Sequence, residues 1–403
     1  MLLHDYLSEC LSGGEMANVE LEQTGLIRFL QLKSPRYYGK ISELQNAIKQ
    51  WLSYITQTFP HYTRHTEEHS IEMIPQLSLM LFIDNNHKKP VITNLSPTEA
   101  YILVVSAFLH DAGMVASDSE KSEILMSEAW RDWTTGQGGG AKRWKQVQAF
   151  LKGNNPEDET LRIFLYDLQT RFLLAEFIRK SHHLRTEQMI KLHEESLGRF
   201  AFGDPVLRRA ISDVCVAHGL NKHELEDAER FPDKRDINGN IVNLRLMAVL
   251  IRIADLLDVS YDRACPLLLN AAAPLPANSM AHWTQYQRIT HRVTAPEKIQ
   301  ITAECQNQNE HRYLRDWFQW LEDEIANAAV LSARWNRHTE WAPPIAILNG
   351  KDPTIKIRPA PGATYIFEDW KLELDIDTIF ERLIYQINPN TSDFIRELIQ
   401  NAY

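Results

Sequence analysis

The residues best suited to chemistry in this sequence are an adjacent histidine and aspartate, His110 and Asp111, which end an apolar stretch. Burying an imidazole beside a carboxylate is costly unless something pairs with them, and a metal ion does this well. Other histidines and one aspartate stand near the ends of further apolar stretches, and such nitrogen and oxygen donors suit a divalent metal. These further candidates are His69, His182, His183, His218 and Asp255.

The candidate ligands divide naturally between two ions. His69, His110, Asp111 and Asp255 can hold one ion. His218 can hold a second together with His182 or His183, with Asp111 as the bridge, and the sequence leaves open which of the adjacent histidines takes part. The remaining histidines lie in polar surroundings and are interpreted as surface residues: His193, His223, His282, His291, His311 and His338.

Apolar helices are predicted to position these side chains. Ser96, Pro97 and Glu99 form a helix-start signature, because serine is a good N-cap, proline suits the first helical position and glutamate can close a capping box. This helix is expected to run through Ala112, with Gly113 as its stop. Helices bearing or bordering the other candidates are expected over residues 161–181, 187–197, 205–218 and 242–259.

The pattern changes after Pro266. Before it the chain is predicted to be nearly all helical, apart from a loop-rich stretch over residues 117–160. After it, Lys298–Cys305 alternates apolar and polar residues like a half-buried strand. A tryptophan-rich helix is expected over 313–335, and short strands over 355–357 and 363–367. The predicted fold class is therefore mainly α, with a helical core and a smaller α+β C-terminal region.

Composition narrows the class of protein. The 403 residues are 44% apolar and 24% charged, as in ordinary globular proteins. The net charge of −10 argues against a broad nucleic-acid-binding surface, although it allows a local basic patch. The four cysteines show no CxxC spacing, which favours free thiols. No secretory signal and no apolar stretch of about 18 residues is evident, so we expect a cytoplasmic protein without membrane contact.

The order of the candidate ligands resembles the HD-domain superfamily of metal-dependent phosphohydrolases. The segments HTEEHS, SAFLHDAGM and IRIADLLD are each similar to that family's ligand-bearing segments. The resemblance covers about residues 40–265. It implies that His69, His110, Asp111 and Asp255 are the core ligands, and the additional histidines match the two-metal branches of the family. It also implies hydrolysis of a phosphoester by metal-activated water.

Residues beside the ligands are predicted to support this chemistry. His110 and Asp111 are expected at the catalytic centre. Arg179 and Arg185 flank the histidine pair and can offset the charge of a substrate phosphate, because guanidinium matches phosphate oxygens; solvated charges at a helix end are the alternative. Arg252 and Asp258 lie one turn either side of Asp255, which favours ion-pair or ligand-supporting roles.

The last twelve residues resemble a different family, the GHKL ATPases, which include gyrase and heat-shock-90-type chaperones. In that family a helix carries the motif E-L-x-x-N-A, found here from Glu397 to Ala402. The resemblance implies that Glu397 activates water and that Asn401 holds the magnesium ion of ATP. No D-x-G-x-G motif follows, so we expect a truncated chain whose ATP site is incomplete.

These inferences give a domain plan and a functional hypothesis. The plan is an N-terminal extension (1–40), an HD domain (41–265), an α+β connector (266–363) and the start of a truncated GHKL domain (364–403). The expected activity is hydrolysis of a nucleotide or cyclic nucleotide with one or two ions of Mn, Mg, Ni, Fe or Zn. In the intact protein this activity would be coupled to the ATPase. HD domains next to such ATPases resemble antiviral defence proteins, and this analogy suggests the same role here. The alternatives are a nuclease acting on single-stranded nucleic acid, a non-catalytic nucleotide sensor that regulates the ATPase, and an oxygenase with the same order of six ligands, which would need iron and dioxygen. A homo-oligomer is allowed.

Overall fold

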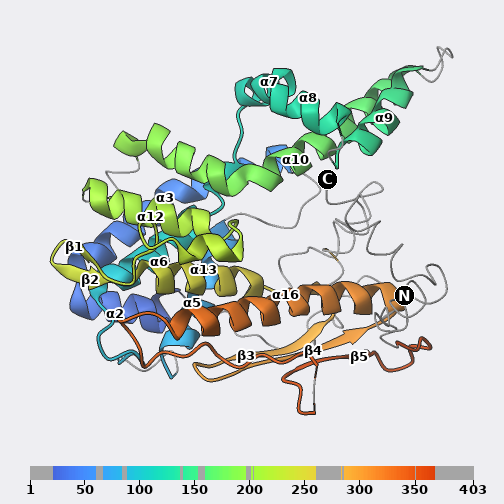
Figure 1. The fold of residues 1–403 in the computed structure, drawn as a ribbon. Coiled ribbons are helices and arrows are strands. Elements are labelled where there is room, and N and C mark those ends of the chain that lie inside the picture. Colours follow the sequence, from blue (N-terminus) through green and yellow to red (C-terminus); the bar gives the residue numbers. More distant parts are fainter. Residues whose placement is uncertain are drawn as a thin grey trace, which may run out of the picture. The chain divides into compact units, whose positions relative to one another are not determined.

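The protein was analysed as a computed structural model. It describes residues 21–59, 67–83, 89–136, 139–152, 159–196, 201–202, 204–259, 283, 286–349 and 351–367. The predicted class, mainly α with a small α+β part on the C-terminal side, is confirmed (Figure 1). The chain divides into two compact units, Met1–Thr364 and Tyr365–Tyr403, and the second lies almost wholly outside the described residues.

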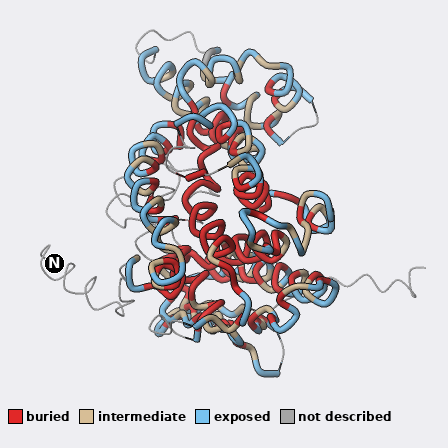
Figure 2. Tube along the Cα trace, turned by 90° about the vertical axis from the view of Figure 1, so that its left-hand side faces the viewer, coloured by how far each residue is buried: buried red, intermediate tan, exposed pale blue. Residues whose placement is uncertain are grey.

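Two apolar helices form the centre of the first unit. Every residue of α6 (Pro97–Leu109) after the proline is buried, and in α13 (Leu244–Leu257) only Arg245 and Asp255 are not (Figure 2). Both helices are hydrophobic on all sides because both are enclosed by other helices. The helices that contact α6 or α13 include α2 (Gly25–Lys33), α3 (Pro35–Ser53), α5 (Glu67–Leu81), α12 (Pro205–Ala217) and α16 (Gln308–Ser332).

The N-terminal region contributes to this helical core. The side chains of Leu26, Ile27 and Leu30 in α2 are fully buried, and α2 contacts α3, α5 and α6. α3 begins at Pro35 behind the N-cap Ser34 and is followed by the short α4 (Ile55–Thr58). The predicted boundary at residue 41 stays a prediction, although a helix before it packs into the core.

Residues 117–160 are mostly helical where they are described, so the prediction of a loop-rich stretch is wrong. The helices are α7 (Asp118–Met126), α8 (Glu128–Thr135) and α9 (Ala141–Ala149), followed by a short 3₁₀ turn at Phe150–Lys152 (η3). Another 3₁₀ turn, Ala112–Met114 (η2), lies just before this stretch. Ser117 forms a capping box with Glu120, and Trp130 contacts Trp133 and Trp144. These local caps and aromatic contacts order a segment whose polar composition suggested loops.

The longest described helix replaces two predicted ones. α10 (Glu159–Leu192) runs without interruption through the segment where we predicted a break between residues 181 and 187. That segment holds no glycine or proline, and nothing else in it stops a helix. His182 and His183 therefore lie within a helix rather than near its end.

A small sheet and a long helix follow the helical core in the sequence. Strands β3 (Ile289–Thr294) and β4 (Ile299–Cys305) are antiparallel, and β5 (Ile355–Pro359) pairs in parallel with β4. The helix α16 (Gln308–Ser332) contacts β4, β5 and α13 (Figure 1). β4 and β5 are confirmed and β3 was missed, while residues 363–367 form no strand, contrary to prediction.

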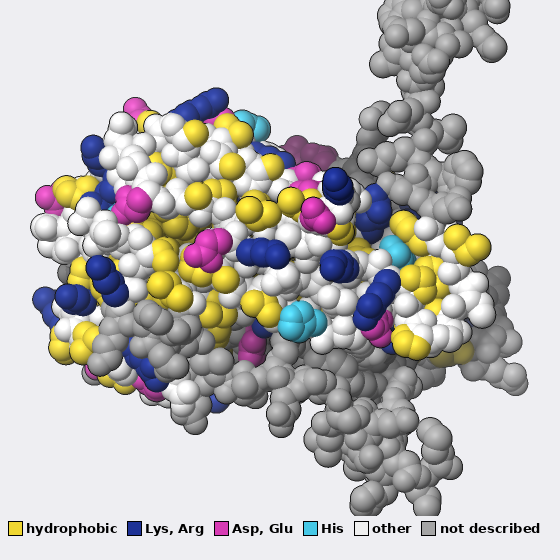
Figure 3. Space-filling model, turned by 90° about the horizontal axis from the view of Figure 1, so that it is seen from below, with side chains coloured by type: hydrophobic (Ala, Val, Ile, Leu, Met, Phe, Trp, Pro, Cys, Tyr) yellow, Lys and Arg dark blue, Asp and Glu magenta, His cyan; other side chains and the backbone are white. Residues whose placement is uncertain are grey.

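A β-hairpin and two short 3₁₀ turns are the remaining described elements of regular structure. The Asn238-Gly239 turn signal is confirmed: both residues have positive φ and join β1 (Arg235–Ile237) to β2 (Asn240–Val242). A short 3₁₀ turn, η5 (Lys222–Glu226), precedes this hairpin, and another, η1 (Leu21–Gln23), precedes α2. On the face seen in Figure 3, Lys and Arg side chains are interspersed with acidic and apolar ones, with no continuous basic patch among the coloured atoms.

Candidate metal centre

The turn that carries His110 and Asp111 begins where α6 ends. α6 starts with the predicted capping box: the Glu99 amide donates to the Ser96 hydroxyl, and the Ser96 amide donates to the Glu99 carboxylate. The helix ends at Leu109 with His110 as its C-cap, so the predicted end at Ala112 is too late. A well-capped apolar helix thus delivers an imidazole and a carboxylate to its own C-terminal end.

Gly113 allows close packing and is not the predicted helix stop. It does not have the positive φ of a glycine that ends a helix. A Cβ atom at this position would lie 2.1 Å from the carbonyl oxygen of His182. The Gly113 amide donates to the Thr186 hydroxyl at 3.0 Å, and that hydroxyl donates to the His110 carbonyl at 2.7 Å. The missing side chain therefore lets the His110-Asp111 turn lie against α10.

A first trio of possible ligand atoms comprises His69, His110 and Asp255. His69 lies in the first turn of α5, and its Nε2 atom is 3.1 Å from His110 Nε2 and 3.3 Å from Asp255 Oδ1. Ligand atoms about 2.1 Å from one ion, at right angles to each other, lie about 3 Å apart. His69 and His110 are buried, whereas the Asp255 side chain is 30% exposed and gives the trio its access to solvent.

A second trio comprises Asp111, His182 and His218. His182 Nε2 lies 3.2 Å from Asp111 Oδ1 and 2.7 Å from His218 Nε2. His183 belongs to neither trio: its ring packs over Gly219, where a Cβ atom would lie 2.2 Å from the ring. The structure thus places His182, and not its neighbour, beside Asp111.

Asp111 lies between the two trios. One carboxylate oxygen, Oδ1, faces His182, while the other, Oδ2, is 3.4 Å from His110 Nε2 and 3.8 Å from His69 Nε2. This is the placement that a bridging carboxylate requires. All predicted ligands except His183 are brought together.

The hydrogen bonds of the four histidines decide which ring nitrogen is available. His110, His182 and His218 each donate from Nδ1 to the carbonyl oxygen three residues earlier, at 2.9, 2.6 and 2.5 Å. His69 donates from Nδ1 to Asp258 Oδ2 at 2.5 Å. Carbonyl and carboxylate oxygens only accept, so each neutral ring carries its proton on Nδ1 and a lone pair on Nε2.

Four lone pairs therefore converge on the centre, and this arrangement fits a metal. Two Nε2 lone pairs 2.7 Å apart, as in His182 and His218, repel each other unless a cation lies between them. Outer hydrogen bonds that fix the tautomer are also typical of metal-binding histidines. The donor set, imidazole nitrogen with carboxylate oxygen, suits Zn, Fe, Ni or Mn and does not single out one of them.

The protonation states at neutral pH are those of ligands. Burial lowers the pKa of His218 to about 3, and the nearby His182 and His110 act in the same direction. Burial also lowers the pKa of His110. These shifts keep both imidazoles neutral near pH 7, with an Nε2 lone pair available, as metal ligands must be.

Asp258 and Arg252 have the supporting roles predicted for them. Asp258 is buried and orients His69 through the hydrogen bond described above. Arg252 is buried, donates to the Ala217 carbonyl at 2.6 Å, and forms an ion pair with Glu324 of α16. Arg292 of β3 donates to the Leu257 carbonyl at 2.5 Å, next to Asp258. Arg252 and Asp258 therefore hold ligand-bearing segments in place.

The two arginines predicted to bind phosphate occupy different environments. Arg185 donates from Nε to the Gly113 carbonyl at 2.9 Å and from Nη2 to the Val115 carbonyl at 3.0 Å, so it ties the turn after Asp111 to α10. Arg179 is exposed on α10, and its carbonyl accepts the His182 Nδ1 hydrogen bond. Of the two, Arg179 retains the accessibility that contact with a substrate needs.

Two histidines interpreted as surface residues are buried. His311 is 7% exposed and His338 is 4% exposed. His338 Nε2 lies 2.8 Å from Glu99 Oε1. Their polar sequence neighbours concealed this. For His338, the contact is with Glu99 of α6, far away in the sequence. Thr186 and Glu324 were also missed, and no local pattern distinguishes either residue.

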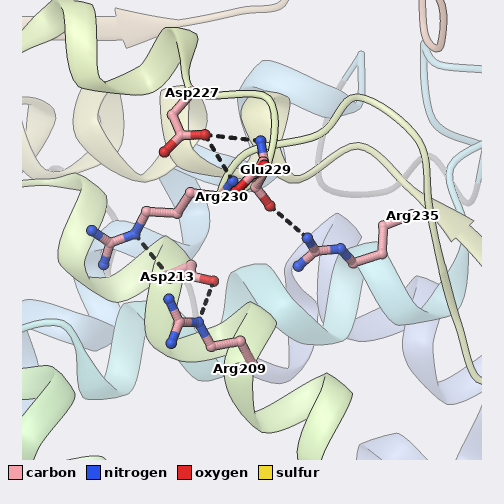
Figure 4. Close-up of a pocket in the computed structure, with 6 residues that line it drawn as sticks. All are labelled: Arg209, Asp213, Asp227, Glu229, Arg230 and Arg235. Atoms are coloured by element: carbon pink, nitrogen blue, oxygen red, sulfur yellow. Dashed lines mark hydrogen bonds and ion pairs between the residues drawn. The ribbon is translucent and has the colours of Figure 1, made fainter.

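A separate cavity lies outside the two trios (Figure 4). It measures about 440 Å³ and is lined by Arg209, Asp213, Asp227, Glu229, Arg230 and Arg235. Arg209 and Arg230 both donate to the buried Asp213, at 2.9 Å each, and Arg235 donates to the Glu229 carbonyl. The Arg230–Asp213 pair joins α12 to the segment over residues 227–235, and the three lining arginines are matched by three carboxylates, which leaves no excess positive charge for an anion.

Two remaining predictions concern the ATP site and membrane contact. Glu397 and Asn401, the predicted ATP and magnesium residues, lie outside them. Among the described residues, no single helix is long and apolar enough to cross a membrane, and only the bent pair Pro97–Met114 with Asp118–Met126 satisfies the length and composition criteria jointly.

Comparison with known proteins supplies a family match. The sequence model of the HD-CE family matches residues 59–327, about two thirds of the chain. The match contains all six residues of the two trios and continues past residue 265 through β3, β4 and most of α16. No curated protein and no solved structure matches.

Proposed function

The chain belongs to the HD-CE family, and on that premise we propose that it is a metal-dependent phosphohydrolase acting on a nucleotide or cyclic nucleotide. The observation that carries the proposal is the convergence of four Nε2 lone pairs and two carboxylates, arranged as two trios that share the neighbourhood of Asp111. Two adjacent ion sites suit phosphoester hydrolysis, which requires both an activated water and stabilised phosphoryl oxygens.

Each part of the site has a distinct task in this proposal. His69, His110 and Asp255 would hold one ion, and Asp111, His182 and His218 a second. When bound, the metal supplies Lewis-acid chemistry, making water a nucleophile near neutral pH and offsetting phosphoryl charge. The partly exposed Asp255 marks the side from which substrate enters. Arg179, exposed one turn before His182, binds a phosphate oxygen of the substrate.

Elemental analysis followed by an activity panel tests the proposal. The purified full chain is expected to contain one or two equivalents of a transition metal and to hydrolyse at least one of a set of nucleoside phosphates and cyclic nucleotides with Mn²⁺, Mg²⁺, Ni²⁺ or Fe²⁺. His110→Ala and Asp111→Ala should lose both metal and activity. Asp118→Asn, an exposed acidic residue of α7, is the control and should retain both. Variants that hydrolyse as well as the parent would refute the catalytic assignment.

The same panel distinguishes the alternative activities. A nuclease would cleave single-stranded DNA or RNA, with an affinity that falls steeply with salt. A sensor would bind a nucleotide without turning it over. The acidic net charge argues against a broad nucleic-acid-binding surface and so favours a small substrate.

Coupling to an ATPase is the furthest part of the proposal. It rests on the motif containing Glu397 and Asn401 and on the resemblance of that motif to GHKL ATPases. The proposal expects a protein that contains this chain and a complete ATPase module to hydrolyse ATP. It also expects Asn401→Ala to abolish that hydrolysis without changing the metal content of the HD site. A role in antiviral defence rests on the same analogy.

A further inference from the structure

We propose that Glu324, on α16, is a positioning residue for the candidate ligand His218 and acts through Arg252. This inference rests on the proposed function, because it requires that His218 binds a metal ion. Glu324 lies beyond the region in which the HD resemblance places the ligands, on a helix that follows the small sheet's first two strands. It touches no candidate ligand itself.

Arg252 links Glu324 to the turn that carries His218. Its Nε atom donates to Glu324 Oε2 at 2.9 Å, and Nη2 donates to Glu324 Oε1, so the carboxylate is held in a two-pronged pair. The remaining nitrogen, Nη1, donates to the backbone carbonyls that follow α12. These are the carbonyls of Ala217 at 2.6 Å, Leu220 at 2.7 Å and His218 at 3.5 Å.

The planarity of guanidinium makes this arrangement directional. Its five N–H groups point in fixed directions within one plane, so the carboxylate that holds two of them also sets where the third nitrogen points. Glu324 therefore determines where Arg252 directs Nη1, and Nη1 determines where the Ala217–Leu220 turn lies. Because His218 is the C-cap of α12 and its ring is fixed by the Cys215 carbonyl, the position of this turn sets the position of Nε2.

Burial indicates that the pair does more than hold two helices together. The side chains of Arg252 and Glu324 are 7% and 4% exposed. Taking both charges out of water offsets much of their attraction, so an apolar pair of similar size would stabilise the contact between α13 and α16 equally well. What apolar side chains cannot provide is a directed hold on backbone carbonyls, and those carbonyls belong to the turn containing His218.

Metal titration of the full chain tests this inference. After removal of bound metal, the Mn²⁺ dissociation constants of the parent, Glu324→Gln, Asp323→Asn and His218→Ala are measured, together with the double variant Glu324→Gln/His218→Ala. Glu324→Gln is expected to weaken Mn²⁺ binding by about tenfold or more, as is typical when the support of a ligand is removed. Asp323→Asn makes the same change in charge at the adjacent exposed position and should stay within about twofold.

The double variant separates positioning from general stability. If Glu324 acts through His218, Glu324→Gln should add less than about twofold once His218 is absent. An equal weakening with and without His218, or unchanged Mn²⁺ binding in Glu324→Gln, would overturn the inference while leaving the proposed function intact. A parent chain that binds no Mn²⁺ or other divalent metal would overturn both.

A second variant covers the case in which Glu324→Gln does not fold. Arg252→Lys keeps the positive charge beside Glu324 but cannot contact the carboxylate and the carbonyls at once. It should weaken Mn²⁺ binding by a similar factor while the far-UV circular dichroism of the parent is retained. Parent-like Mn²⁺ binding in a folded Arg252→Lys protein would also overturn the inference.

Discussion

Glu99 offers the most quantitative test of how the helix carrying His110 and Asp111 is held. Its side chain is fully buried and its carboxylate accepts hydrogen bonds from four residues. The Glu99 Oε2 atom accepts hydrogen bonds from the Ser96 amide at 2.8 Å and from the Ser96 hydroxyl at 2.9 Å. The Oε1 atom accepts from the Asn243 amide at 2.9 Å and from His338 Nε2 at 2.8 Å. Arg337 donates to both oxygens, at 3.2 Å each. Asn243 is the N-cap of α13, so Glu99 aligns the helices that carry His110, Asp111 and Asp255.

The free energy follows from the pKa of this carboxyl. Burial acts to raise the pKa of Glu99, but the hydrogen bonds from His338 and Arg337 outweigh it and lower the pKa from 4.5 to about 2. A tenfold change in an acidity constant corresponds to about 1.4 kcal/mol, so ionised Glu99 contributes about 3 kcal/mol to folding. Because its pKa is lower in the folded state, this contribution is present above about pH 4.5 and is lost as the pH falls towards 2.

Glu99→Gln should therefore lower the free energy of unfolding by about 3 kcal/mol at pH 7. It also leaves the partly buried Arg337 without its carboxylate partner. Urea unfolding followed by tryptophan fluorescence measures this, and the difference from the parent should shrink between pH 4.5 and pH 2.5. Glu123→Gln, at an exposed position of α7, should change the free energy of unfolding by less than about 0.5 kcal/mol. A loss below about 1 kcal/mol for Glu99→Gln at pH 7, or one that does not depend on pH, would refute the reasoning.

Four further substitutions, with Gly39→Ala as a control, test the neighbourhood of the metal centre. Gly113→Ala should lower the melting temperature by several degrees and reduce metal content, because its Cβ atom would lie 2.1 Å from a carbonyl oxygen of α10. Gly39→Ala is the control, because a Cβ atom there would have no neighbouring atom within 4 Å. It should leave metal content unchanged and leave the melting temperature unchanged or slightly higher. Asp258→Asn should weaken metal binding by about 10- to 100-fold, and titration showing parent affinity would contradict its orienting role. Steady-state kinetics should show that Arg179→Gln raises KM in a folded enzyme. Arg185→Gln should mainly lower the melting temperature, because the Arg185 guanidinium holds two backbone carbonyls. The reverse pattern would exchange the roles assigned to the two arginines.

Local sequence signals were sufficient for the central helix and for the types of ligand. A capping box followed by an apolar run predicts α6 by itself, because the N-terminal hydrogen bonds and the apolar composition are local properties of the sequence. An imidazole and a carboxylate at the end of such a helix already require a partner. The strand β4 and the turn at Asn238 were predictable for the same reason, since alternation and turn chemistry involve only neighbouring residues.

The sequence alone could not decide between His182 and His183 as the ligand. Adjacent residues of a helix point about 100° apart, so only the rotation of α10 against the His110-Asp111 turn decides which ring faces Asp111. That rotation is fixed by Gly113 and Thr186, whose contact joins residues far apart in the chain. The same holds for the burial of His338, which depends on its contact with Glu99.

The sequence by itself determined which side chains can bind a metal and which helices carry them, because residue type, capping and apolar periodicity are properties of neighbouring residues. It also predicted two ion sites with Asp111 as their bridge. Only the tertiary structure chose His182 over His183, turned each Nδ1 towards an acceptor and joined Arg252 to Glu324. Each of these depends on how helices distant in the sequence are rotated and packed against one another, and no local pattern records that geometry.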